Sequence, residues 1–551
     1  MTAKRPIKRI ALVFPCQVTT RGYDIESVKR KGQFAEAPLG LAYISAFIKR
    51  FGYEVKIFDA HLMAVKGLAL GTYSRLDEIE DELMSQIKEF SPDVVGISCL
   101  FHYTYRTAHR ITGRIKREIK NVITVMGGAY PTISTDVALG DENIDFVVLG
   151  EGERAFLNLL EALNGRINFD GLKAVAYRDK EGQPVIKSEC SLLVPLNEVP
   201  FPDRTDLALE DYYRYGRHTI QRFEDYEGQE IKVATLVATR GCVFNCSFCA
   251  AKKIWSGMRF RDSANVLDEM QWLKETYGID HFSFNDDNLL INRKFACELL
   301  QGIIERKLNI RWMTGGMSIR GLNEEMIRLA LESGCLIFNL AIESANEDTL
   351  AKIRKPVSAE EAIRAVEMIR KHKDAYIIGL FILGFPGETE EQVLETVRFG
   401  KSLQCDWTNY ALLTPFPGSD IYDEAKAAGI LLEEVDSDFE KLDFRNYVLR
   451  QEQLSPGFLE REAYFANLDQ NFFDNPNLRR GKVEIALSGF KNTLQIAPTH
   501  ATAYYCVGRI HEARGEKDLA RQFYELASNN LSGLHRAYFE KLGIDLRSLS
   551  V

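Results

Sequence analysis

Short apolar runs rich in β-branched residues alternate with amphipathic stretches along the first 165 residues of the chain. Such runs are typical of buried parallel strands, and amphipathic stretches such as 39–52 and 107–120 are typical of helices that cover a sheet. The expected strands are KRIALVF (8–14), YEVKIFD (53–59), DVVGISC (93–99), NVITVMG (121–127) and IDFVVLG (144–150). The alternation predicts an α/β fold whose first domain, residues 1–165, is a doubly wound, Rossmann-like sheet of five strands.

The residues that directly follow these strands are the candidates for ligand binding, because a doubly wound sheet binds its ligand outside the carboxyl ends of its strands. Gly127 and Gly128 lack side chains and therefore let a large ring or its tail approach the backbone. Ser98, at the end of the neighbouring strand, can donate a hydrogen bond. The candidates are Ser98, Gly127, Gly128, Thr132, Gly150 and Glu151. The alternative is a sheet whose glycines only make turns.

A second series of strand-like and helix-like segments begins near residue 230. Residues 166–229 before it show little periodicity and are expected to be a linker. The expected strands are IKVATLVATRG (231–241), HFSFND (281–286), NIRWMTG (309–315), LIFNLAI (336–342), YIIGLFILG (376–384) and WTNYALL (407–413). Six βα units within residues 230–450 predict a partial (β/α)6 TIM-like barrel.

The C-terminal region, residues 455–551, is expected to be a small all-α domain with a repeat. Three residues recur after 34 positions, Gly481, Ala486 and Phe490 as Gly515, Ala520 and Tyr524. This period resembles the tetratricopeptide (TPR) pattern, although Ser532 replaces the closing proline that Pro498 provides in the first repeat. The alternative is an ordinary helical hairpin. Three repeats are usually needed for independent stability, so these helices are expected to dock on the barrel or on a partner.

Composition narrows the class of protein. The chain has 551 residues and a net charge of −9, with no basic run, so no nucleic-acid partner is expected. Its longest apolar stretches, such as 375–385, are too short to span a bilayer, and the apolar run near the N-terminus is too short for a signal peptide. Seven of the ten cysteines are scattered singly, unlike a disulfide framework. We therefore expect a cytoplasmic protein.

The other three cysteines, Cys242, Cys246 and Cys249, lie within eight residues in TRGCVFNCSFCAAKK (239–253). They directly follow the first strand of the expected barrel, at the face where barrel active sites lie. A structural zinc site needs four ligands, and no fourth cysteine or histidine is near in the sequence. Iron–sulfur clusters also usually take four thiolates. Three thiolates therefore indicate a cluster with one iron left open to another ligand.

The C-x3-C-x2-C spacing, with Phe248 before the last cysteine, resembles the signature of the radical S-adenosylmethionine (SAM) superfamily. This resemblance implies a [4Fe–4S] cluster whose open iron binds the amino and carboxylate groups of S-adenosylmethionine. It also implies that reduction of the cluster cleaves S-adenosylmethionine to a 5′-deoxyadenosyl radical, which abstracts hydrogen from an unactivated position. No catalytic residue beyond the cluster ligands is assignable.

Two later strand ends also resemble this family. NDDN (285–288) is similar to the segment that holds the amino group of S-adenosylmethionine, and Asp286 and Asp287 can accept hydrogen bonds from an ammonium. IESA (342–345) is similar to the segment that contacts the ribose, where Glu343 and Ser344 can bond hydroxyl groups. With Phe248, these four residues are the predicted S-adenosylmethionine site.

A doubly wound sheet ahead of such a barrel resembles the cobalamin-binding branch of the superfamily, and GGAYPT (127–132) and VVLGEGE (147–153) resemble segments of its first domain. The resemblance implies that the six candidates after the first-domain strands contact cobalamin. The loop after the first strand, PCQVTTRGYD (15–24), contains no histidine, and His61 follows the second strand instead. The resemblance to this branch therefore implies base-off cobalamin without a histidine ligand, and the alternative is another side chain or a water on the lower face of the cobalt.

The resemblance implies an enzyme, most simply a methyltransferase that adds a methyl group from methylcobalamin to an unactivated carbon. The alternative is a cyclase, ring-rearranging or oxidative enzyme with the same cofactors, and a non-enzymatic cobalamin sensor is less expected. A methylthiotransferase would want a further cysteine cluster in the first domain, which is absent from the sequence. The expected partners are a small-molecule or lipid substrate and an electron donor of the flavodoxin or ferredoxin type. The TPR-like region is expected to bind a protein or to self-associate.

Overall fold

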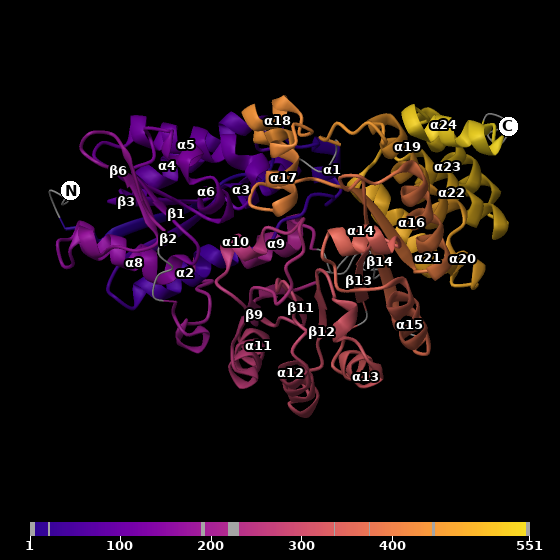
Figure 1. Cartoon of the computed structure of the whole chain (residues 1–551), viewed down its shortest axis with the longest axis horizontal. Coiled ribbons are helices and arrows are strands. Elements are labelled where there is room, and N and C mark those ends of the chain that lie inside the picture. Colours follow the sequence, from indigo (N-terminus) through magenta and orange to yellow (C-terminus); the bar gives the residue numbers. More distant parts are fainter. Residues whose placement is uncertain are drawn as a thin grey trace.

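A computed structural model of the chain describes residues 6–19, 22–188, 193–218, 231–335, 337–373, 375–442 and 447–546. Residues 20 and 21 of the loop after the first strand and residues 219–230 of the predicted linker lie outside the described part. The chain folds into three parts that follow one another in sequence and contact one another in space (Figure 1). None of the helices in the described residues has the length and hydropathy needed to cross a membrane.

The first part contains a seven-stranded sheet of order β2-β1-β3-β4-β5-β6-β7. Its strands are β1 (Arg9–Phe14), β2 (Glu54–Asp59), β3 (Val94–Ser98), β4 (Ile123–Gly127), β5 (Phe146–Val148), β6 (Val175–Arg178) and β7 (Pro184–Lys187). The five predicted strands are present and parallel. The linker differs from its prediction, because β6 and β7 extend the sheet with antiparallel pairs. These strands have only four residues each and lie at the edge, so they leave no long apolar run in the sequence.

Helices cover both faces of this sheet (Figure 1). They are α1 (Ile25–Lys29), α2 (Leu39–Lys49), α3 (Ala60–Leu70), α4 (Leu76–Phe90), α5 (Tyr105–Glu118), α6 (Ala129–Ile133), α7 (Thr135–Leu139) and α8 (Gly152–Leu163). Helix α2 packs against α8, and α3 packs against α4. The carboxyl ends of the parallel strands stay open towards the second part of the chain, which is where a ligand of such a sheet binds.

The second part contains two three-stranded parallel sheets, β12-β11-β8 and β13-β14-β15. Their strands are β8 (Val233–Leu236), β11 (His281–Phe284), β12 (Arg311–Thr314), β13 (Ile337–Glu343), β14 (Tyr376–Leu383) and β15 (Trp407–Leu412). All six strands were predicted. Backbone bridges from Trp312 to Cys335 and from Met317 to Leu340 join the two sheets. A two-residue ladder of β9 (Thr239–Arg240) with β10 (Arg259–Phe260) was not predicted, because two residues carry no periodic signal.

Helix α9 (Leu209–Tyr215) precedes β8 and packs against α3 of the first part. The helices after β8 are α10 (Ala251–Ile254), α11 (Ser263–Tyr277), α12 (Arg293–Glu305), α13 (Glu324–Glu332), α14 (Glu347–Lys352), α15 (Ala359–Arg370), α16 (Glu390–Leu403), α17 (Asp420–Ala427) and α18 (Glu433–Ser437). Two of them start with capping boxes, in which Ser358 pairs with Glu361 and Thr389 with Gln392. Such reciprocal bonds satisfy free backbone N–H groups and fix where a helix begins.

The third part is helical and covers the open edge of β15. Its helices are α19 (Pro456–Leu468), the π-helical turn η7 (Asp469–Phe473), α20 (Pro476–Arg479), α21 (Val483–Ile496), α22 (Ala501–Ala513), α23 (Lys517–Asn529) and α24 (Gly533–Leu542). Asn471 accepts from Thr408 N at 2.8 Å and donates to Thr408 O at 2.7 Å. Asn467 bonds Tyr410 N and O in the same way, at 3.2 and 3.0 Å. Two side-chain amides therefore replace the missing neighbour strand, which an exposed edge otherwise invites from another chain.

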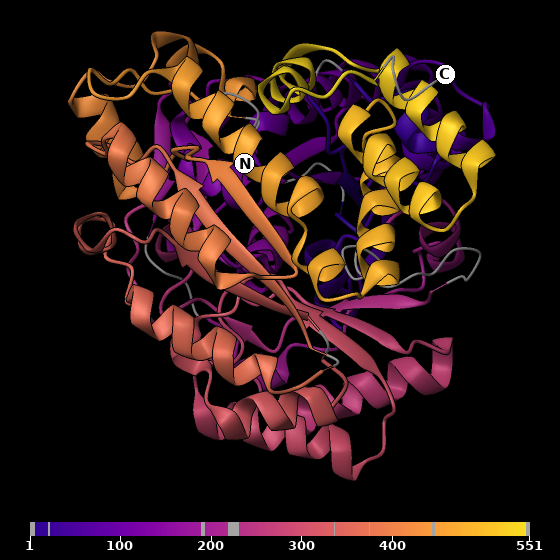
Figure 2. The same ribbon diagram turned by 90° about the vertical axis from the view of Figure 1, so that its right-hand side faces the viewer.

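The third part also reaches back to the first. Arg217 donates to Asn492 Oδ1 at 2.7 Å, and Arg30 donates to the Tyr504 hydroxyl at 3.5 Å. Figure 2 shows these C-terminal helices in yellow, beside the strands of the second part and in front of the first. The third part therefore contacts both other parts of the chain.

Asn471→Ala is expected to destabilise the protein by about 2–4 kcal/mol, because it leaves the buried Thr408 N–H and C=O groups without partners. Urea unfolding at neutral pH measures this loss. Asn529→Ala, at an exposed position of α23, is the matched control and is expected to change little. Equal stability of the two variants would contradict a role for the amide in closing the edge.

Acid is expected to weaken the third part through two histidines, the buried His535 and the half-buried His500. The His535 ring bonds the Tyr464 hydroxyl at 2.9 Å and the Thr502 hydroxyl at 2.8 Å, and its centroid lies 4.5 Å from that of His500. Burial lowers the pKa of His535 to about 4, and burial with the neighbouring ring lowers the pKa of His500 to about 3. Since both pKa values lie below the unfolded value, the unfolded state binds protons first as the pH falls below about 6.5.

Their contribution to stability is therefore complete above about pH 6.5 and is lost towards pH 4, by up to about 1.4 kcal/mol per pH unit for each ring. His535→Gln removes one titrating group and is expected to flatten the dependence of unfolding free energy on pH between 6.5 and 5. His372→Gln, at a half-buried position outside this cluster, should keep the wild-type dependence. An unchanged slope in His535→Gln would refute this origin of the acid sensitivity.

Candidate functional site

The three clustered cysteines lie in one loop at the carboxyl ends of β8 and β11. Cys246 is buried, and Cys242 and Cys249 are half-buried. Asn288, just after β11, donates its side-chain N–H to Cys242 Sγ at 3.5 Å, and Cys249 N donates to Cys246 O at 3.1 Å. All three are free thiols. In the described residues no three His, Cys, Asp or Glu side chains are grouped to hold a single metal ion.

The two aspartates predicted to bind S-adenosylmethionine hold the backbone that leads into this loop. Asp286 is buried and accepts from the N–H groups of Ala238, at 3.1 Å, and Thr239. Asp287 accepts from Gly241 N at 3.1 Å. Burial raises the pKa of Asp286 to about 7, although these hydrogen bonds oppose the shift. The carboxylates therefore position the cysteines directly, and any contact with S-adenosylmethionine would be additional.

Glu343 lies at a strained point of the backbone. Its φ is 73°, in the left-handed region that non-glycine residues seldom adopt, where the pairing of β13 with β14 shifts register. Its carboxylate accepts from Lys355 Nζ at 2.8 Å, and both side chains are largely buried. Strained residues of this kind cluster at functional sites. Glu343 is therefore a stronger candidate than its sequence context alone suggested.

Lys355 is a site residue that the sequence did not reveal. Its Nζ lies 5.9 Å from the centre of the Phe248 ring. Burial raises the pKa of Cys246 to about 11, and Lys355 opposes this rise as the nearest cation. The segment before it also supports the cysteine loop, since Ser247 N donates to Ile353 O at 2.9 Å. Only the fold brings this loop after α14 beside the cysteines, so no local motif could have indicated it.

Ser344 is a predicted ribose contact whose hydroxyl already has partners within the protein. It is fully buried, its Oγ lies 3.2 Å from Thr396 Oγ1 in α16, and it accepts from Asn346 N at 3.2 Å. The Phe248 ring lies 5.9 Å from that of Phe385. The structure thus gathers Phe248 and Glu343 near the cysteines, while the Ser344 hydroxyl is engaged by the protein itself.

The β3 and β4 ends leave a gap that suits a ligand. Gly128 has a φ of 111°, and a Cβ there would lie 2.3 Å from Cys99 O, so the chain itself requires this glycine. At Gly127 a Cβ would meet only Val148 O, at 3.9 Å. Ser98 pairs with Gly127 in the sheet, and its hydroxyl makes no hydrogen bond to the described residues. Open backbone beside a free hydroxyl fits a group that inserts between these strand ends.

Thr132 and Glu151 have structural partners. Thr132 donates to Gly128 O at 2.7 Å and accepts from Gly150 N at 3.0 Å, which ties the β4 turn to the β5 turn. Glu151 accepts from Arg240 at 2.5 Å and from Arg259, both in the second part of the chain. Of the six predicted cobalamin contacts, Ser98 and Gly127 are thus those whose surroundings leave most room for a ligand.

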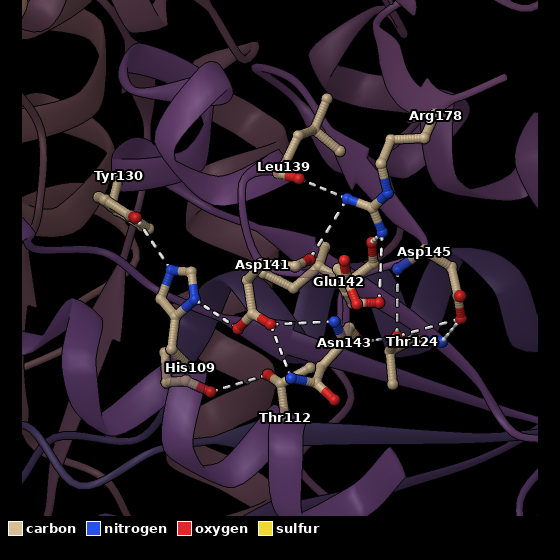
Figure 3. A network of polar contacts seen from close by, with 12 residues as sticks. His109, Thr112, Thr124, Tyr130, Leu139, Asp141, Glu142, Asn143, Asp145 and Arg178 are labelled. Carbon is tan, nitrogen blue, oxygen red and sulfur yellow. Dashed lines mark hydrogen bonds and ion pairs between the residues drawn. The ribbon is translucent and has the colours of Figure 1, made fainter. Parts of the chain in front are cut away.

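A series of hydrogen bonds from Tyr130 through His109 to Asp141 supports the GGAYPT turn (127–132). The Tyr130 hydroxyl lies 2.9 Å from His109 Nε2, and His109 Nδ1 lies 2.7 Å from Asp141 (Figure 3). Asp141 also accepts from Asn143 N at 2.9 Å. Tyr130 is fully buried. The backbone of the turn is therefore fixed before any ligand binds.

The histidines near this edge are engaged by the protein. His61 is buried, with Nδ1 at 2.7 Å from the Tyr23 hydroxyl and Nε2 at 2.8 Å from Phe34 O. His102 Nε2 lies 3.0 Å from Ser134 Oγ. Both ring nitrogens of His61 therefore have protein partners.

The two parts match two known families. Residues 28–160 match the B12 binding domain, and residues 236–400 match the Radical SAM superfamily. An uncharacterised methyltransferase of Pyrococcus horikoshii is 30% identical over 74% of this chain and 82% of its own length. The cytidylyl-2-hydroxyethylphosphonate methyltransferase of Streptomyces wedmorensis is 29% identical over 72% and 78%. The anaerobic magnesium-protoporphyrin IX monomethyl ester cyclase of Rubrivivax gelatinosus is 28% identical over 77% and 71%.

A solved structure shares the fold across almost the whole chain. The radical S-adenosylmethionine methyltransferase TsrM of Kitasatospora setae, with cobalamin and a [4Fe–4S] cluster bound, has a TM-score of 0.61 at 18% identity, over 94% of this chain and 99% of its own. The predicted cofactors, a [4Fe–4S] cluster with S-adenosylmethionine and cobalamin, are confirmed by the two domain matches. The chain is an enzyme that belongs to the radical SAM superfamily, in the group whose members carry a B12 binding domain ahead of the radical SAM domain.

Proposed function

We propose that this enzyme methylates an unactivated carbon of a small molecule. The observation that carries the proposal is the meeting of the two cofactor edges: a Cβ at Gly150, in the β5 turn, would lie 3.7 Å from Ile254 O at the end of α10, just after the cysteine loop. The relatives and the structural neighbour that bear methyltransferase names support it. When bound, the cofactors supply a 5′-deoxyadenosyl radical and a methyl group.

The residues of the chain bind and orient these groups. Cys242, Cys246 and Cys249 are proposed to ligate three irons of the cluster, with Lys355 as the cation beside their thiolates. Phe248, Asp286, Asp287, Glu343 and Ser344 remain the proposed surroundings of S-adenosylmethionine, with the two aspartates acting mainly on the loop. Ser98 and Gly127 are proposed to receive cobalamin, together with Gly128, Thr132, Gly150 and Glu151 around them.

We interpret the two three-stranded sheets as halves of one partial TIM-like barrel, within the proposed boundaries 230–450. On its second half, Phe381 and Tyr410 stack on the face that packs against α16. The opposite face, which we take as the lumen, carries side chains that are only partly buried or exposed, and these are Ala341, Leu380, Ile382, Asn409 and Ala411. The same face also carries the partly buried Tyr376 and Trp407 and the buried Asn339, so it has two amides and no charge. It favours a largely apolar substrate, such as a lipid, over a charged phosphonate.

The proposed boundaries of the other parts are 1–165 and 455–551, with 166–229 between the first two, where β6 and β7 extend the first part's sheet beyond residue 165. Helices α21 to α24 are proposed to form a TPR-like unit, supported by Gly508, where a Cβ would lie 2.7 Å from the Tyr524 ring. This unit is proposed to bind a protein or a second copy of the chain. The electron is proposed to come from a flavodoxin or ferredoxin, in the cytoplasm.

The second candidate is a cyclase, ring-rearranging or oxidative enzyme with the same cofactors. The similarity to an anaerobic cyclase over 77% of this chain favours it. The methylase differs from it in one measurable way, since only the methylase needs its cobalamin to be remethylated. Because the methyl group comes from the cofactor, no side chain of the protein indicates which of the two activities it has.

Cys249→Ala is expected to abolish the cluster, because it removes one of three iron ligands. Iron and acid-labile sulfide are measured after anaerobic reconstitution. Cys297→Ala, which removes a partly exposed single cysteine of α12, is the control and should keep the wild-type content. Wild-type iron content in Cys249→Ala would contradict the assignment of the loop.

The reconstituted, reduced enzyme is expected to move a deuterated methyl group from S-adenosylmethionine to its bound cobalamin. Mass spectrometry of the extracted cobalamin detects the label. If cobalamin stays unlabelled while 5′-deoxyadenosine accumulates, the cyclase proposal replaces the methylase. If purified wild-type protein retains no cobalamin, neither proposal stands.

A further inference from the structure

A short antiparallel ladder closes the base of the cysteine loop. Strand β9 before the loop and strand β10 after it pair antiparallel, with Arg240 opposite Arg259 and Thr239 opposite Phe260. The loop between the two strands, residues 241–258, is therefore anchored at both of its ends by this two-residue ladder. One of the two pairs of this ladder, Arg240 with Arg259, brings two guanidinium groups to the base of the loop.

Both guanidinium groups reach the same turn of the first part, between β5 and α8. Arg240 donates to Glu151 at 2.5 Å and to Glu153 at 2.5 Å, using its two terminal nitrogens. Arg259 donates to Glu151 as well, and to Val194 O at 3.2 Å. Two carboxylates and two guanidiniums thus form one neutral network across the boundary between the two cofactor domains.

This network is buried. The side chains of Arg240, Glu151 and Glu153 are 9%, 8% and 6% exposed. Burial alone would raise the pKa of Glu153, but Arg240 outweighs it and the pKa is lowered. The Arg240 guanidinium also lies 5.6 Å from the Tyr43 ring of the first part and 5.8 Å from the Trp255 ring at the end of the loop. A buried bidentate arginine between two rings has few alternative positions, so it fixes geometry more strictly than a surface pair does.

The turn that receives Arg240 is also part of the cobalamin edge. Gly150 directly precedes Glu151, and its N–H donates to Thr132 of the GGAYPT turn. One short segment, 150–153, therefore touches the proposed cobalamin site on one side and the base of the cysteine loop on the other.

We propose that Arg240 is a positioning residue that sets the separation of cluster and cobalamin by clamping the base of the cysteine loop to Glu151 and Glu153. This inference rests on the proposed function, because it requires both cofactors to be bound. It goes beyond that function in assigning a role to the ion pairs that Arg240 makes between the two cofactor domains.

The test uses the holoenzyme reconstituted with cluster and cobalamin, as wild type and as Arg240→Lys and Glu153→Gln. Lysine keeps the charge but cannot reach both carboxylates, and Glu153→Gln keeps the Arg240–Glu151 pair. Pulsed electron paramagnetic resonance measures how the reduced cluster accelerates relaxation of the cobalt spin, an effect that falls steeply with separation. Both variants are expected to show weaker, more broadly distributed coupling than wild type.

A second readout separates positioning from simple loss of structure. Transfer of a deuterated methyl group from S-adenosylmethionine to bound cob(I)alamin breaks the methyl–sulfur bond, forms a cobalt–carbon bond with the two cobalt electrons and releases S-adenosylhomocysteine. Its single-turnover rate should fall about tenfold or more in Arg240→Lys, since a misplacement of about 1 Å has an effect of this order. Cleavage of S-adenosylmethionine to 5′-deoxyadenosine, which needs only the cluster, should stay at the wild-type rate.

Arg106→Ala is the matched control, because Arg106 pairs with Asp438 at 3.1 Å across the same two domains but at the surface. It should keep wild-type coupling. Wild-type coupling in Arg240→Lys and Glu153→Gln with both cofactors bound would overturn the inference. Loss of cobalamin from both variants would also overturn it, because the contact would then be needed for binding and not for separation. Absence of cobalamin from the wild type would instead refute the proposed function.

Discussion

The hydrogen bonds from backbone N–H groups to Asp286, which is buried, and to Asp287, which is exposed, are the interactions on which the site depends. Asp286 and Asp287, which lie just after β11, accept hydrogen bonds from the N–H groups of residues 238, 239 and 241. The segment after β11 therefore fixes the segment that follows β8. A loop with three thiols has no secondary structure of its own to hold it. Its geometry comes from neighbouring strand ends, and parallel strands supply these because their carboxyl ends lie side by side.

The open edge of the second part's sheet, at β15, is also held by side chains. Strand β15 ends a parallel sheet, and its free N–H and C=O groups are met by the amides of Asn467 and Asn471, one helical turn apart. A helix cannot pair with a strand through its backbone, since its own groups are used internally. Side-chain amides can, because each carries one donor side and one acceptor side. The C-terminal helices therefore cover the open edge of the second part's sheet in addition to forming a unit of their own.

The sequence predicted the long buried strands well because continuous β-branched runs such as ITVMG and IFNLAIE have few other stable placements. It missed β6, β7, β9 and β10, whose two to four residues depend on pairing partners far along the chain. Among site residues, the cysteines were predictable from spacing. Lys355 was not, because its place beside them arises from the turn after α14, and the engagement of Ser344 and Glu151 by the protein could be seen only in three dimensions.

Polar groups that have no protein partner indicate where a cofactor can bind. Along the cofactor edges, most polar groups that motif resemblance would assign to ligands already have protein partners, as Thr132 and Glu151 do. The groups most open to a ligand are the three free thiols, of which Cys242 accepts a long hydrogen bond from Asn288, the Ser98 hydroxyl and the uncovered backbone at Gly127. A ligand gains most where it meets groups that folding has left open. Engaged residues then act by holding the geometry, so substitutions at Asp286 or Glu151 should alter where a cofactor lies before they alter whether it binds.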